Sequence, residues 1–264
     1  MNKSAAGGLR AVRPAVAWQP MAPETVGMPL YRAVKRALLQ AIESGAVAAG
    51  DALPNEMALA RSLGVSVGTL RRAVDDLVAE HILVRRQGRG TFVATHTRDR
   101  FLFQFFHVER GDGLREPPEV ELVSFDRNRL DEEAATELRI KVGSPAFQIE
   151  NRLRLQGRPV VYDRLLLPAA LFKGLTEKRL SERPSTLYHL YQSEFGISVV
   201  HAQERLRAVG ADRAAARVLG VAMGQPVLQV RRLAIALGGL PVEWRVSTVA
   251  TQHYDYVNLL SRAA

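Results

Sequence analysis

Residues 55–93, NEMALARSLGVSVGTLRRAVDDLVAEHILVRRQGRGTFV, predict two helices followed by a hairpin. Asn55 can cap a short first helix, and Gly64 can end it in a left-handed cap. Ser66 can cap the second helix, whose inner apolar stripe would be Leu70, Val74 and Leu77. The segment 82–86 reads as a strand, QGRG at 87–90 as a turn, and 91–94 as the returning strand.

The spacing of small and large residues predicts how the two helices meet. Ala60 is small enough to let them approach, Gly64 suits the tight turn, and Leu70 can lock a steep crossing angle. An earlier helix is predicted between Pro29 and Gly45. A helix-turn-helix followed by a hairpin is a winged helix.

The polar side chains of this winged helix favour DNA as a partner. Arg71 and Arg72 face away from the predicted core and could reach guanine or phosphate, while Arg89 in the glycine-rich wing could enter a minor groove. The alternative is a small interaction domain whose solvated arginines bind nothing. The predicted DNA-binding residues are Tyr31, Asn55, Ser66, Thr69, Arg71, Arg72, Gln87, Gly88, Arg89, Gly90 and Thr91.

The rest of the chain contains an internal repeat. Residues 131–161 can be laid on residues 212–243, with a constant offset of 81 residues and one insertion near the end. The matched pairs include Asp131 with Asp212, Gly143 with Gly224, Pro145 with Pro226, and Pro159 with Pro241. Two such units, each reading strand, helix, turn and hairpin, predict one domain of two similar halves that share a sheet. A cleft between them would be a natural ligand site.

Composition sets outer bounds on function. The 264 residues allow two ordinary domains, and the formal net charge of +9 is spread along the chain, so placement of charge says more than its sum. The absence of Cys excludes disulfides and thiolate chemistry. The sequence has no long apolar run and no signal-peptide core, which favours a cytoplasmic protein.

Both parts of the chain resemble a known family. Residues 29–95 are similar to the winged-helix domain of GntR-family transcription regulators, through GDALPNE, LGVS, TLRRAVDDL and VRRQGRGTFV. Residues 98–260 resemble the UTRA effector domain of the HutC subfamily, through RLRLQGRPVV, FGI, GQPVL and PVEW. The resemblance implies an α+β chain in which a winged helix-turn-helix precedes a chorismate lyase-like α/β domain with a mixed, mainly antiparallel sheet. It also implies a homodimer on palindromic double-stranded DNA, tuned by a small molecule.

The expected organisation follows from this resemblance. A flexible tail at 1–28 precedes the DNA-binding domain at 29–94, a linker at 95–100, and the effector and dimerisation domain at 101–260. The hinge between the domains is expected in ATHTRDR, residues 94–100. Two departures concern the DNA side. The chain has Met57 and Val67 where the family usually has DNA-contacting arginines and keeps only Arg71, so its operator should differ from the common family half-site.

In the second domain, Arg152 and Arg154 are two apart on a predicted strand and share a face, while Asp163 lies on the partnering strand. The family resemblance implies that both arginines line the effector pocket and favour an anionic group. The alternative is a solvated sheet face with a surface salt bridge. The predicted effector residues are Arg152, Arg154, Asp163, Thr186, Tyr188, Glu204 and Glu243.

Two other classes of function remain open at this level. A chorismate lyase-like fold could hold an enzyme, although no phosphate-binding loop, dinucleotide fingerprint or HExxH motif is present and the six histidines are scattered. The chain could also be a DNA-binding factor without an effector. We expect no catalytic site, cofactor or metal, and a regulator whose ligand changes the geometry of a DNA-bound dimer.

Overall fold

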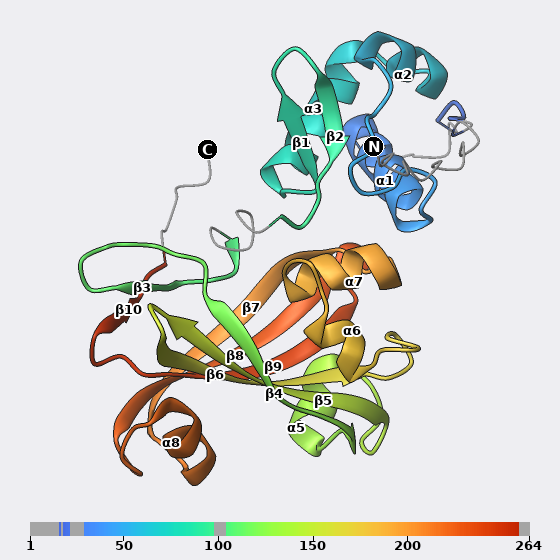
Figure 1. The fold of residues 1–264 in the computed structure, drawn as a ribbon. Helices are drawn as coiled ribbons and strands as arrows, with labels where there is room; N and C mark the ends of the chain where they lie inside the picture. Colours follow the sequence, from blue (N-terminus) through green and yellow to red (C-terminus); the bar gives the residue numbers. More distant parts are fainter. Residues whose placement is uncertain (1–15, 17, 22–28, 98–103, 259–264) are drawn as a thin grey trace, which may run out of the picture. The chain divides into compact units, whose positions relative to one another are not determined.

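The computed structural model describes residues 16, 18–21, 29–97 and 104–258 (Figure 1). The chain forms two compact units, Met1–Val93 and Ala94–Ala264. The expected tail at 1–28 lies mostly outside the described residues, as do residues 98–100 of the expected linker.

The first unit is a small helical core with a hairpin. Its elements are α1 (Leu30–Glu43), α2 (Glu56–Leu63), α3 (Val67–Ala79), β1 (Leu83–Arg86) and β2 (Gly90–Val93). Asn55 and Ser66 cap α2 and α3, and Gly64 ends α2 in the left-handed conformation at φ 67°. These three predictions are confirmed. The apolar stripes of the helices meet in a core of Val34, Leu38, Leu59, Leu63, Leu70, Val74 and Leu77.

The second unit is built on a six-stranded sheet in the order β4-β5-β6-β9-β8-β7, and every neighbouring pair is antiparallel. The predicted mainly antiparallel sheet is therefore confirmed. Its strands are β4 (Glu119–Arg129), β5 (Pro145–Leu155), β6 (Arg158–Pro168), β7 (Val199–Gly210), β8 (Pro226–Ala236) and β9 (Pro241–Val249). The other elements are β3 (Val108–Arg110), α5 (Glu132–Leu138), α6 (Glu177–Ser181), α7 (Leu187–Phe195), α8 (Arg213–Leu219), the short helix η1 (Leu237–Gly239) and β10 (Tyr254–Tyr256).

The sequence repeat appears as two structural halves, β4-α5-β5-β6 and β7-α8-β8-β9. Asp131 caps α5 and Asp212 caps α8, each by accepting from the backbone N–H three residues later. Arg164 and Val246 are Cα partners in the central β6–β9 pair and also occupy equivalent positions in the two halves. An approximate two-fold axis of the sheet therefore passes between them.

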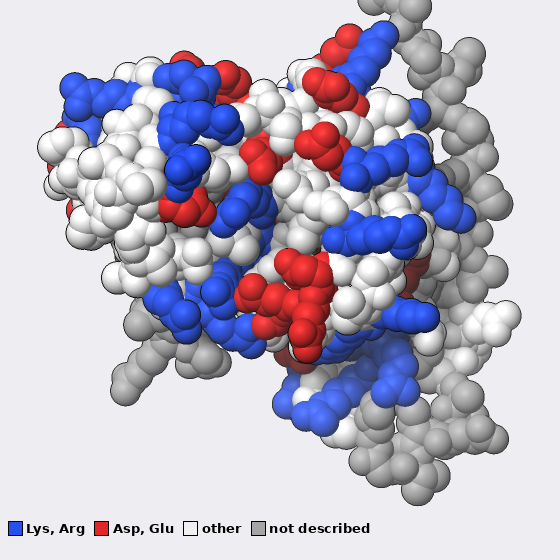
Figure 2. Space-filling model, turned by 90° about the horizontal axis from the view of Figure 1, so that it is seen from below, with Lys and Arg blue, Asp and Glu red and all other residues white. Residues whose placement is uncertain are grey.

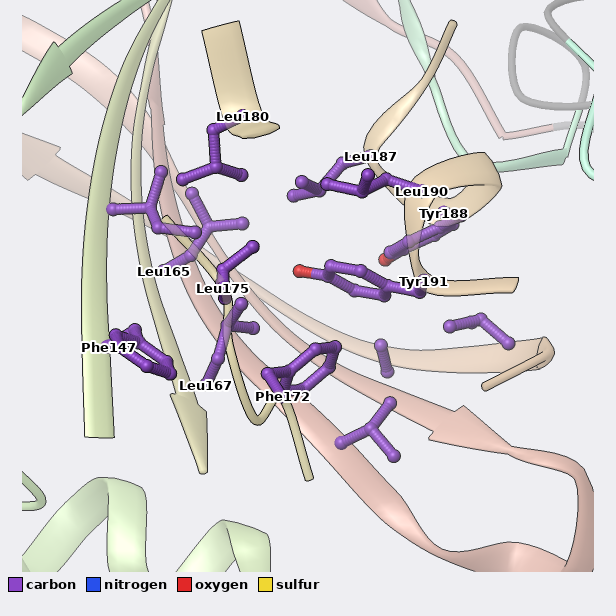
Figure 3. Close-up of a cluster of buried hydrophobic side chains, with 14 of the residues drawn as sticks. Phe147, Leu165, Leu167, Phe172, Leu175, Leu180, Leu187, Tyr188, Leu190 and Tyr191 are labelled. Carbon is purple, nitrogen blue, oxygen red and sulfur yellow. The ribbon is translucent and has the colours of Figure 1, made fainter. Parts of the chain in front are cut away.

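The helices divide between the two faces of this sheet (Figure 1). One face carries α5 and α8, and the other carries α6 and α7. Tyr188 and Tyr191 project from α7 into an apolar cluster with Leu165, Leu167 and Phe172 (Figure 3). This cluster packs α7 against the sheet.

Candidate nucleic-acid interface and ligand cavity

The outer face of α3 carries two exposed arginines, each held by a neighbour. The Arg71 Nε donates to Glu56 Oε2 at 2.6 Å, and this hydrogen bond and charge raise the pKa of Arg71. The Arg72 guanidinium lies over the Tyr31 ring at 4.1 Å from its centroid. Both arginines stay exposed and are oriented before any DNA arrives.

The predicted polar residues at the helix starts act first as caps. The Ser66 Oγ accepts from the Thr69 N–H at 3.1 Å and lies 2.8 Å from the Thr69 hydroxyl, while Asn55 Oδ1 accepts from Met57 N–H at 2.9 Å. Both caps lie on exposed helix starts. Contacts of Ser66, Thr69 and Asn55 with DNA stay predictions.

The wing tip is fully exposed. Gly88 and Gly90 adopt φ values of 67° and 104°, which L side chains rarely adopt, so glycine is required for this tight turn. Gln87 and Arg89 are exposed between them, and Thr91 is half-buried at the start of the returning strand. The geometry presents backbone and one arginine to a groove, as a DNA-binding wing does.

Two apolar side chains lie at the same helix starts. Met57 is 65% exposed in the first turn of α2, and Val67 is half-buried in the first turn of α3. These positions cannot make the charged contacts that the family pattern would provide.

The second unit contains a cavity of about 340 Å³ on the face that carries α6 and α7. Its floor is the central sheet, and its wall is the segment between α6 and α7. The lining residues are Pro117, Pro118, Glu119, Val120, Asn151, Leu153, Asp163, Ser181, Arg183, Pro184, Ser185, Thr186, Leu187 and Arg245.

A buried charge network closes the inner end of this cavity. The Arg245 guanidinium donates to Asp163 Oδ2 at 3.1 Å and to Glu243 Oε1 at 2.9 Å. Glu243 is completely buried and also accepts from the hydroxyls of Tyr188, at 3.2 Å, and Tyr191, at 2.7 Å. Burial, together with the charge of Glu243, raises the pKa of both tyrosines. The network thus gives the cavity a rigid polar inner end.

Two of the predicted residues, Asp163 and Thr186, line the cavity. Tyr188 and Glu243 lie directly behind its wall in the same network. Thr186 caps α7 by accepting from the His189 N–H at 3.2 Å. Glu204 does not line it and instead belongs to an ion pair in the second half of the repeat.

Arg152 and Arg154 do not line this cavity, and their role in effector binding stays a prediction. They do share a face, as predicted, but it is the opposite face of the sheet. Arg152 is the cross-strand partner of Glu121, whereas Asn151 is the partner of Asp163. Both arginines bind Glu121, Arg152 with a distance of 3.0 Å from Nε to Oε2. Side chains alternate along a strand, so Asn151 and Leu153 occupy the cavity side.

Sequence reasoning missed three cavity residues, Asn151, Arg183 and Arg245. Asn151 directly precedes the predicted pair Arg152 and Arg154 on the same strand. Because neighbouring residues of a strand face opposite sides of the sheet, assigning the cavity to the other face would have identified Asn151. Arg245 follows the PVEW motif, at the position that matches Asp163 in the repeat. For Arg183, in the irregular segment between α6 and α7, the sequence offers no signal.

In the second half, a charged side chain in an ion pair occupies the position equivalent to Asn151. Arg232, which matches Asn151 in the repeat, donates to Glu204 Oε1 at 2.6 Å and to the Phe105 carbonyl at 2.5 Å. Tyr256 also donates to Glu204. Burial opposes the charge of Glu204, but Arg232 and Tyr256 outweigh it and lower the pKa of Glu204. Two cavities lie beside this ion pair, one of about 30 Å³ lined by Arg232 and one of about 510 Å³ lined by Glu204, His107 and Tyr256.

Residues 94–97, part of the expected hinge, are bound to α7. The Gln192 side chain accepts from His96 N–H at 2.9 Å and donates to the Ala94 carbonyl at 3.2 Å. His189 Nδ1 lies 3.0 Å from the His96 carbonyl oxygen, and the His96 ring packs against Tyr188 at 5.8 Å between centroids. Ala94 and His96 are buried, so residues 94–97 are anchored on α7, while residues 98–100 of the expected linker lie outside the described residues.

Charge is mixed over the surface. On the face that Figure 2 shows, blue Lys and Arg side chains alternate with red Asp and Glu side chains.

Among the described helices, none is both long and apolar enough to cross a membrane. The same part of the chain contains no group of three His, Cys, Asp or Glu residues placed to hold a metal ion.

Comparison with known proteins covers both units. Residues 30–93 match the family of bacterial regulatory proteins called gntR, and residues 114–255 match the UTRA domain. The chain is 28% identical over 219 residues to the "Probable fructoselysine utilization operon transcriptional repressor" of Escherichia coli strain K12, covering 81% of this chain and 87% of that protein. It is 27% identical over 239 residues to the HTH-type transcriptional repressor NagR of Bacillus subtilis, covering 89% of this chain and 96% of that one.

A solved structure agrees with the second unit. The ligand-binding domain of a GntR-family protein from Bordetella bronchiseptica is 36% identical, with a TM-score of 0.57, and covers 60% of this chain and 99% of its own. The family models together span both compact units that the structure describes. The chain therefore belongs to the GntR family of bacterial regulatory proteins, in which it joins a winged-helix domain to a UTRA domain.

Proposed function

We propose that this protein is a transcriptional repressor that binds a palindromic operator as a homodimer and releases it when a small anionic metabolite enters the UTRA cavity. The observation that carries the proposal is the coexistence, in one GntR-family chain, of an exposed pre-oriented α3 face and a separate polar cavity. The relatives named as repressors support the sign of the regulation.

On the DNA side, we assign base reading to Arg71 and backbone or base contact to Arg72. Glu56 holds the Arg71 guanidinium by a side chain on α2, which fixes its direction from the α3 surface. The wing residues Gln87–Thr91 supply further affinity through the neighbouring groove. A bidentate arginine contact contributes about 1–3 kcal/mol of discrimination against the wrong base.

The route from cavity to DNA runs through α7. Its N-terminal residues Thr186 and Leu187 line the cavity, and Gln192 near its other end holds residues 94–97, which lead covalently to the wing. A ligand that shifts α7 would therefore shift the anchor of the DNA-binding unit. Gln192 is a positioning residue in this scheme.

The first experiment is selection of genomic fragments with the purified protein, followed by anisotropy titration of the enriched sequence. An inverted repeat with half-sites one or more helical turns apart supports the proposal. Arg71→Ala should lower specific affinity about tenfold or more and leave non-specific binding nearly unchanged. Equal affinity and equal specificity for the variant would refute the assignment of Arg71.

The coupling route has its own test. Gln192→Ala should leave operator affinity without ligand nearly unchanged and should reduce the release of DNA by ligand. Ser193→Ala is the matched control, because its hydroxyl binds only within α7, at 3.5 Å from the Leu190 carbonyl. If ligand released DNA from Gln192→Ala as fully as from the parent protein, the proposed coupling through α7 would be refuted.

A further inference from the structure

The cavity holds two polar groups that lack partners in the described structure. Asn151 is 5% exposed, and its Oδ1 is buried without a hydrogen bond. The Arg183 Nε is likewise buried without a hydrogen bond. A buried polar atom without a partner costs free energy, so both atoms are positioned for groups that a ligand would bring.

The charge of Arg183 is also uncompensated. Its Nη1 donates to the Leu180 carbonyl, and no described carboxylate forms an ion pair with it. Burial lowers the pKa of Arg183, Tyr191 opposes the shift, and the charge of Arg245 adds to it. Arginine nevertheless stays protonated in proteins, so the cavity wall carries a positive charge with reduced hydration.

The second cation of the cavity, Arg245, already has its charge balanced by carboxylates of the protein. Arg245 is already bound by two carboxylates, those of Asp163 and Glu243. Asp163 is itself satisfied, because Oδ2 accepts from Arg245 and Oδ1 accepts from the Ser247 hydroxyl at 2.5 Å. Arg245, Asp163 and Glu243 are buried and Arg183 is half-buried, and these four charges sum to zero. Glu119 also lines the cavity but is exposed, and no described carboxylate forms an ion pair with Arg183.

We propose that the cavity selects a small monoanion that also carries a hydrogen-bond donor, with the acidic group bound at Arg183 and the donor bound at Asn151 Oδ1. This inference rests on the proposed ligand site and narrows its chemistry to polyhydroxy or amino monocarboxylates. A dianion such as a phosphate monoester would bring a second charge with no free cation, and burying an unpaired charge is costly. The volume of about 340 Å³ suits a ligand of about this size class.

The test uses probes that separate the two recognition groups. The probes are six-carbon hexonates (D-gluconate, D-galactonate and D-mannonate), whose hydroxyls sample several positions relative to the carboxylate. D-glucitol has the hydroxyls without the charge, hexanoate has the charge without the hydroxyls, and D-glucose 6-phosphate is the dianion. The readout is the melting temperature of the full chain, since a ligand bound only to the native state raises it.

We expect at least one hexonate to raise the melting temperature more than all three comparison probes at the same concentration. Arg183→Met should weaken that hexonate about 10- to 100-fold, because it removes a charge-assisted hydrogen bond. Asn151→Leu should weaken it about tenfold. The matched control is Arg179→Met, which removes an exposed cation of α6 that pairs with Glu194 at 3.2 Å and does not line the cavity, so it should leave the affinity unchanged.

Three results would overturn the inference. They are equal stabilisation by glucitol or hexanoate, stronger stabilisation by the dianion, and no stabilisation by any hexonate. The unliganded Arg183→Met protein gives a second check. It should melt about 2–4 °C higher than the parent, because an unpaired buried charge is gone. Operator release is measured separately, so a hexonate that binds without releasing DNA would refute the proposed regulation and keep the ligand class.

Discussion

The two halves of the UTRA sheet have the same backbone plan and differ in what covers the inner end of their hairpins. The first half places neutral Asn151 opposite Leu122 and leaves a cavity of about 340 Å³. The second half places Arg232 opposite Glu204, and this ion pair lies beside a cavity of about 30 Å³ that Arg232 lines and one of about 510 Å³ that Glu204 lines. A single sheet architecture thus supports either a neutral side chain beside a cavity or an ion pair, depending on the residue at one equivalent position.

The largest expected effect concerns the network that both halves share. Glu243→Ala should destabilise the protein by about 3–5 kcal/mol, because it leaves buried Arg245 with one carboxylate fewer and two tyrosine hydroxyls without an acceptor. Chemical denaturation monitored by circular dichroism measures the change in free energy of unfolding. Glu121→Gln on the exposed face is the control. Similar losses of unfolding free energy for the two variants would mean that the buried network contributes no more to stability than an exposed ion pair.

The ion pair of the second half should make stability depend on pH. The pKa of Glu204 is lowered in the folded state, so its contribution is complete above the unfolded pKa, near 4.5, and is lost as pH falls through the folded pKa. Glu204→Gln should therefore show a smaller loss of stability between about pH 5 and pH 3 than the parent. Urea midpoints across that range measure it. Parallel pH profiles for the two proteins would contradict this expectation.

The caps test whether the halves are energetically alike. Asp131→Ala and Asp212→Ala each remove a side chain that accepts from a backbone N–H, at 2.8 Å and 2.7 Å. Each should cost about 1 kcal/mol of stability, with a difference below about 0.5 kcal/mol. Thermal unfolding with both variants in parallel decides the question. A clearly larger loss of stability for one of the two variants would show that the two halves share a backbone structure without contributing equally to stability.

The smallest expected effect concerns the C-terminal ends of the same two helices. Arg139 occupies the left-handed cap of α5 at φ 56°, where the second half has Gly220 at φ 70°. Arg139→Gly should stabilise the protein by about 0.5–1 kcal/mol, because glycine adopts this conformation without a steric penalty. Gly220→Arg should destabilise by a similar amount, since a Cβ there would meet nothing within 4 Å and only the backbone is strained. Equal melting temperatures would refute this.

Much of the fold could be predicted from local patterns. Helix caps and glycine turns depend only on residues close together in the sequence, so they can be predicted from it. The caps of this kind are Asn55, Ser66, Asp131 and Asp212. The repeat further predicted that the halves share a sheet. Family resemblance led to Thr186 and Asp163 at the cavity.

The candidate site was harder, because it depends on which face of a strand a residue occupies. The pair Arg152 and Arg154 had the expected spacing, yet a shift of one residue moves a side chain to the other side of the sheet. Arg183 lies in an irregular segment whose path depends on the packing of α6 and α7. Neither periodicity nor a motif reports such a position.

The pairing of Asp163 with Arg245 has a consequence for how such a domain can be made. These residues occupy equivalent positions in the two halves and meet across the central axis at 3.1 Å. Two identical copies would place the same side chain on both sides of that axis, and two like charges cannot be buried together. An ion pair between equivalent positions at the centre of the sheet therefore requires two half-domains that are joined in one chain and differ in sequence. Covalent duplication gave this domain an asymmetry that a symmetric dimer of half-domains could never have.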